Sequence, residues 1–69
     1  MQMKTKYRLI SKSDNRVDFR STAYETAMYL NGLRLDDMLV IKSDERGDRL
    51  VNFYNAENFE ELSAAIKEA

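Results

Sequence analysis

Polar and apolar residues alternate in two stretches near the start of the chain, at residues 4–11 and 16–20. A period of two is typical of a β-strand that buries one of its faces. The residues between them, 12–15, favour a turn because Asp and Asn tolerate left-handed backbone. The pattern predicts a β-hairpin whose buried face carries Tyr7, Leu9, Val17 and Phe19.

A helix is predicted directly after this hairpin. Thr22 and Glu25 have the spacing of a capping box, in which the side chains bind N–H groups that the first helical turn leaves free. Apolar residues between 23 and 30 then recur at helical spacing. The helix is expected to end before Gly32, because glycine adopts the left-handed C′ conformation without steric cost.

The second half of the chain repeats the order of strand, strand and helix. The unbroken apolar run at 38–41 predicts a strand that is central in a sheet, and residues 43–48 predict the turn after it. Alternation over residues 49–55 predicts the next strand, with Val51 and Phe53 facing the core. The last helix is expected to start near Asn58, with Glu61 in a second capping box.

These elements define the expected fold class. With each hairpin paired internally, a right-handed crossover through the first helix places the first strand beside the third. The result is an α+β fold, ββαββα, with a four-stranded antiparallel sheet in the order 2-1-3-4 and two helices packed on one face. Residues 1-69 are expected to form a single compact domain.

A duplication is one explanation of the repeated order of elements. Two related ββα units would span 1-33 and 38-69, and Lys-Ser-Asp occurs in both, at 12–14 and at 42–44. Two hairpin–helix units that merely obey the same folding rules explain the match equally well, so both interpretations stay open.

The composition removes most catalytic chemistry. The 69 residues include no histidine and no cysteine, which excludes Ser-His-Asp and Cys-His sites, disulfides and the usual zinc ligands. The two glycines, Gly32 and Gly47, are explained by a helix end and a turn, so no glycine-rich phosphate loop is expected. The acidic turn at 44–48 contains Arg46 and is expected to be solvated rather than to bind calcium. We therefore expect no enzyme, no catalytic residue, no metal, no cofactor and no small-molecule substrate.

Charge is unevenly distributed around the net charge of −1. Seven basic and three acidic residues up to Leu35 give +4, whereas four basic and nine acidic residues from Asp36 onward give −5. Such asymmetry is found at polar interaction surfaces, although ordinary solvated charge also explains it. The first residues lack the apolar stretch of a signal peptide, and no run reaches the ~18 apolar residues of a membrane helix. We expect a cytoplasmic protein without membrane association.

Two helices can cover only one face of four short strands, so the other face is expected to stay open. The third strand contributes either Leu39 and Ile41 or Met38 and Val40 to it, because both sides of that strand are apolar. An exposed apolar patch usually indicates a binding surface. The candidate binding residues on this face are Lys4, Lys6, Arg8, Ile10, Arg16, Arg20, Leu50, Asn52 and Tyr54.

The favoured function is a small non-catalytic protein-binding module, an adaptor or inhibitor of a larger assembly, that uses this face. The partner is either a larger acidic protein or a second copy in a homodimer. The alternative is single-stranded nucleic acid, with phosphates on the basic N-terminal hairpin and a base stacked on Tyr54. One expected aromatic residue on the face and a slightly acidic chain favour a protein partner. A third interpretation is that the cations only keep an edge hairpin soluble.

Overall fold

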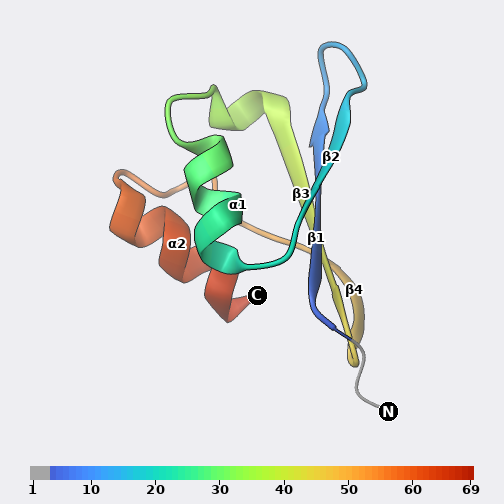
Figure 1. Ribbon diagram of the computed structural model, residues 1–69. Coiled ribbons are helices and arrows are strands. Elements are labelled where there is room, and N and C mark those ends of the chain that lie inside the picture. Colours follow the sequence, from blue (N-terminus) through green and yellow to red (C-terminus); the bar gives the residue numbers. More distant parts are fainter. Residues whose placement is uncertain (1–3) are drawn as a thin grey trace.

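The computed structural model describes residues 4–69, and its four strands form one antiparallel sheet (Figure 1). The strands are β1 (Lys6–Ser11), β2 (Val17–Arg20), β3 (Met38–Asp44) and β4 (Gly47–Leu50). Their order across the sheet is β2-β1-β3-β4, which confirms the order that crossover handedness predicted. The N-terminal strand therefore lies inside the sheet, between β2 and β3.

Both α-helices lie on the same side of the sheet (Figure 1). α1 (Ala23–Leu30) connects β2 to β3, with the short 3₁₀ helix η1 (Leu35–Asp37) just before β3, and α2 (Phe59–Glu68) follows β4. The element order is ββαββα, so the predicted α+β fold with two helices on one face is confirmed. One face of the sheet is left without a helical layer.

Both helices begin where the capping residues predicted. The Thr22 hydroxyl accepts a hydrogen bond from the Glu25 N–H at 3.1 Å, and the Asn58 side chain accepts one from the Glu61 N–H at 2.9 Å. The glutamates differ from an ideal capping box. Glu25 accepts from the Thr22 hydroxyl, whereas Glu61 accepts from the Glu57 N–H.

The hydrophobic core fills the space between the helices and the covered face of the sheet. Strands, helices and the segment after β4 all contribute side chains to it, as amphipathic elements of a two-layer fold must. Its buried members are Tyr7, Leu9, Ala27, Leu30, Met38, Val40, Val51, Phe53, Leu62 and Ile66.

The last hairpin is tighter, and its second strand shorter, than the sequence predicted. Asp44 pairs directly with Gly47, so the turn is shorter than the expected 43–48. β4 ends at Leu50, although the Val51 N–H still donates to the Val40 carbonyl at 2.8 Å. Beyond Val51 the chain leaves the ladder to reach α2 (Figure 1). The strand expected over 49–55 was therefore wrong in its second half.

The predicted orientation of β2 was also wrong. Val17 and Phe19 are 46% and 53% exposed and lie on the face without helices. Residues directly opposite each other in an antiparallel pair share a face. The four-residue loop between Ser11 and Arg16 places Asp18 opposite the buried Leu9, so the apolar residues of β2 point the other way.

Candidate functional site

The face of the sheet opposite the helices, called the open face below, carries two rows of side chains across the strands. The two rows are brought together by strand register, because each row combines residues that lie opposite each other on neighbouring strands. From β2 toward β4, one row is Phe19, Arg8, Ile41 and Leu50, and the next is Val17, Ile10 and Leu39.

Six of these seven residues are apolar, and three of the six are well exposed. Leu50 is 61% exposed, Phe19 53% and Val17 46%. Ile10, Leu39 and Ile41 are half-buried by their neighbours. The third strand thus contributes Leu39 and Ile41, while Met38 and Val40 are in the core. Isolated exposed apolar residues are ordinary, but a contiguous group on one face indicates an interaction surface.

Cationic side chains border one corner of this apolar group. Lys6 places its Nζ atom 5.2 Å from the centroid of the Phe19 ring. An open hollow of about 680 Å³ lies there, lined by Lys4, Lys6, Arg8, Val17, Phe19 and Ser43. The corner therefore offers an aromatic surface together with several positive charges.

These charges are poorly neutralised within the molecule. Arg8 meets Asp48 at 3.8 Å, and the two side chains are 40% and 63% exposed, so the attraction is weak. Neither Lys4 nor Lys6 takes part in an ion pair with any described residue. Asp48 lies opposite Ser43 on the open face. It is the one acidic residue on this face among the strands of residues 4–69.

Two predicted site residues do not belong to the open face. Arg20 lies opposite Tyr7 on the helix side, where its guanidinium stacks on the Tyr29 ring at 4.8 Å and donates to the Phe19 carbonyl at 2.6 Å. Arg16, just before β2, borders a separate hollow that Tyr29 also lines. Their predicted placement on the open face was wrong. The loop length, which sets the register of β2, reverses the predicted sides of Arg16 and Arg20 just as it reverses that of Val17.

Tyr54 and Asn52 lie beyond the end of β4. The Tyr54 ring stacks on Phe53 with centroids 4.5 Å apart, and its hydroxyl donates to the Met38 carbonyl at 2.6 Å. Tyr54 is 39% exposed, but its ring and hydroxyl are both engaged within the chain. Asn52 is exposed outside the ladder. Of the nine predicted residues, the structure brings together Lys4, Lys6, Arg8, Ile10 and Leu50.

Val17 and Phe19 belong to the open face, although the sequence argument placed them in the core. The signal that would have found them is the loop length. When a hairpin loop has an even number of residues, odd-numbered residues of one strand lie opposite even-numbered residues of the other. The loop at 12–15 has four residues, and Tyr7 and Leu9 are core residues. The even-numbered Asp18, and not Phe19, therefore shares their side of the sheet.

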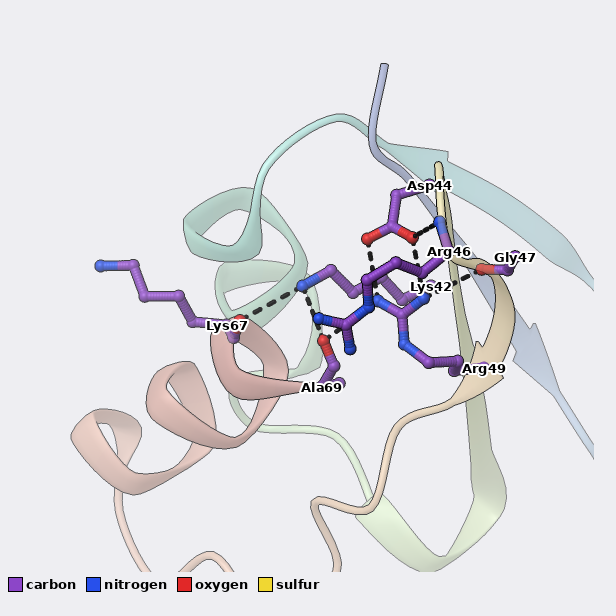
Figure 2. A network of polar contacts seen from close by, with 7 residues as sticks. All are labelled: Lys42, Asp44, Arg46, Gly47, Arg49, Lys67 and Ala69. Atoms are coloured by element: carbon purple, nitrogen blue, oxygen red, sulfur yellow. Dashed lines mark hydrogen bonds and ion pairs between the residues drawn. The ribbon is translucent and has the colours of Figure 1, made fainter. Parts of the chain in front are cut away.

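A second group of charged side chains has a structural role (Figure 2). On the helix side, Lys42 donates to the carbonyls of Lys67 and Ala69 at 3.2 and 3.0 Å. Arg49 also donates to the Ala69 carbonyl and binds Asp44 through two 2.8 Å contacts. The Lys67 side chain points away from this group (Figure 2). Positive charges at the C-terminal end of α2 stabilise its unsatisfied carbonyls.

The Arg49 guanidinium determines the ionisation of Asp44. Its hydrogen bonds, together with one from the Arg46 N–H, hold the pKa of the Asp44 carboxyl well below its usual range. The same pair raises the pKa of Arg49. Both groups therefore stay charged at neutral pH and serve to fix the last hairpin against α2.

The described residues suggest neither a metal site nor a membrane-spanning segment. Residues 4–69 contain no group of three or more Asp and Glu side chains placed to hold a metal ion. Neither α-helix in that range has the length and hydropathy that crossing a bilayer requires. No family model matches this chain, and searches of curated proteins and of solved structures found no significant match.

Proposed function

We propose that this protein is a non-catalytic binding module that docks on a larger protein through the open face of its sheet, as an adaptor or an inhibitor. The observation that carries the proposal is the exposure of Val17, Phe19 and Leu50 on one continuous face. Burying each Å² of such surface is worth about 25 cal/mol, so covering this face would supply a driving force for association.

The arrangement of side chains on the open face also fits this role. Apolar residues lie at its centre and charges at one corner, which is the usual anatomy of an interface, an apolar core with a polar rim.

The positions of the aromatic side chains support a protein partner over single-stranded nucleic acid. Sheet surfaces that bind RNA stack bases on two or three aromatic residues of adjacent strands. On the strands of residues 4–69, Phe19 is the one aromatic residue on the open face. Tyr54, the residue expected to stack on a base, instead covers Phe53.

A capture experiment with a matched control tests the proposal. Tagged wild-type protein and the double variant Phe19→Thr/Leu50→Thr are used to recover partners from cells that express the protein. Threonine keeps the β-propensity of both strands and removes the two largest exposed apolar side chains of the open face. We expect the wild type to recover a protein that the double variant loses.

The control is Tyr24→Gln/Met28→Gln, which removes two exposed apolar side chains from α1, on the opposite side of the molecule. It should retain the same partner. If all three proteins recover the same set, or if only the α1 variant loses the partner, the open face is not the docking surface.

A further inference from the structure

We infer that the open face binds an acidic segment of the partner protein that also carries an apolar side chain, and that it does not bind a second copy of this chain. This inference rests on the proposed function and specifies the chemistry of the partner. It depends on the corner where Lys4, Lys6 and Arg8 line one hollow together with the exposed Phe19.

Charge complementarity selects the acidic partner. Among residues 4–69, the corner presents three cations against Asp48 alone, and Asp48 is already engaged with Arg8 across β3. Lys4 and Lys6 have no ionic partner within the described part of the chain. A carboxylate-rich surface would neutralise them and would be attracted to the corner before contact.

The same charges disfavour a homodimer built on this face. Two copies stacked sheet to sheet would enclose twice the number of cations, from Lys4, Lys6 and Arg8, with only two copies of Asp48. Like charges brought together at an interface strongly disfavour association. A second copy therefore matches the apolar rows but not the charged corner.

The shape of the corner indicates what such a segment contains. The hollow beside Phe19 measures about 680 Å³, which is within the ~300–1,000 Å³ range of ligand pockets and has room for more than one side chain. Phe19 and Val17 line it together with Lys4, Lys6, Arg8 and Ser43. A lysine can present its alkyl stem to an apolar group while its ammonium group stays in water. An apolar side chain would pack in it while neighbouring carboxylates pair with Lys4 and Lys6.

Selection from a library of random displayed peptides tests this inference with the 69-residue protein. We expect the enriched peptides to combine several Asp or Glu residues with at least one aromatic or aliphatic residue. Fluorescence anisotropy then measures the affinity of the protein for the best peptide. This affinity should fall about tenfold in the variant Lys4→Gln/Lys6→Gln, and by a similar factor when the salt concentration of the wild-type assay is raised. It should also fall in Phe19→Thr/Leu50→Thr.

The control variant, Arg34→Gln/Lys67→Gln, removes the same amount of charge from side chains outside the open face and should change the affinity less than about twofold. Enriched peptides without acidic residues that still require Phe19 and Leu50 would overturn the inference and leave the proposed function intact. Enriched peptides that bind Phe19→Thr/Leu50→Thr as well as they bind the wild type would contradict both.

Two further outcomes would overturn the inference in favour of another occupant. One is a concentration-dependent dimer in light scattering that Phe19→Thr/Leu50→Thr abolishes, which would assign the face to a second copy. The other is competition between the selected peptide and single-stranded poly(dT) that depends on Phe19, which would assign it to nucleic acid.

Discussion

At the scale of single residues, the tripeptide Lys-Ser-Asp occurs twice, but its two lysines have different surroundings. Lys12 lies in an exposed turn and donates to the Asp36 carbonyl at 2.9 Å. Lys42 is 9% exposed and donates to two carbonyls at the end of α2. Only the second lysine connects a strand to a helix.

Replacing Lys42 with methionine should therefore destabilise the protein by about 1–2 kcal/mol, because carbonyls at the end of α2 lose a charged donor. The matched control, Lys12→Met, removes an exposed lysine from the same tripeptide and should cost less than about 0.5 kcal/mol. Urea unfolding followed by circular dichroism measures both changes. Equal losses in the two variants would contradict the role assigned to Lys42.

Asp44 should make stability depend on pH in the acid range. Its pKa in the folded protein lies below the ordinary value of about 3.9, so its ion pair stabilises the fold above that value and is lost as the pH falls toward the folded pKa. Urea unfolding between neutral pH and pH ~2 should show a smaller loss of stability in Asp44→Asn than in the wild type. Arg49→Gln removes the main cause of the lowered pKa of Asp44 and should likewise reduce the loss of stability in acid. An unchanged pH profile in both variants would exclude this pair as a contributor.

At the scale of elements, the helices and their ends were predictable because their signals are local. Thr22 and Asn58 cap the helices as their positions indicated, and Gly32 has the positive φ of +87° expected just after a helix. The strand β4 was predicted too long because alternation continues to Asn55 while pairing stops after Val51. Where pairing ends depends on the path to α2, which local alternation does not encode.

The orientation of β2 shows a second limit of local pattern. Val17 and Phe19 alternate with polar residues just as core residues would, and alternation alone does not say which side is buried. In the structure the polar residues of β2 face α1, where the Tyr29 hydroxyl donates to the Asp18 carboxylate at 2.6 Å. A polar contact thus joins the edge strand β2 to α1, and the apolar side chains of β2 lie on the open face.

Tyr29→Phe should weaken this connection and lower the free energy of unfolding by about 1 kcal/mol. The control Tyr24→Phe removes a hydroxyl from an exposed tyrosine of the same helix and should leave stability within about 0.5 kcal/mol of the wild type. The hydrogen bond to Asp18 also raises the pKa of Tyr29, so the stabilisation should be retained up to pH ~10 and lost above it. Equal effects of the two substitutions would refute this account of β2.

At the scale of the whole molecule, the existence of an open face followed from the number of layers. Two helices cover one side of four strands, and five of the nine predicted residues lie together on the other side. The list was incomplete because its β2 members depend on register. The corrected face is more apolar than the predicted one, since Val17 and Phe19 replace Arg16 and Arg20.

The central claim is that this face stays exposed in the free protein and is covered by a partner. Hydroxyl-radical footprinting measures the exposure of side chains directly, in the protein alone and bound to the partner that the wild type captures. The account predicts that Phe19 and Leu50 are labelled in the free protein and protected in the complex, while Tyr24 and Met28 are labelled in both. Protection of Tyr24 and Met28 instead, or a Phe19 that resists labelling in the free protein, would contradict it.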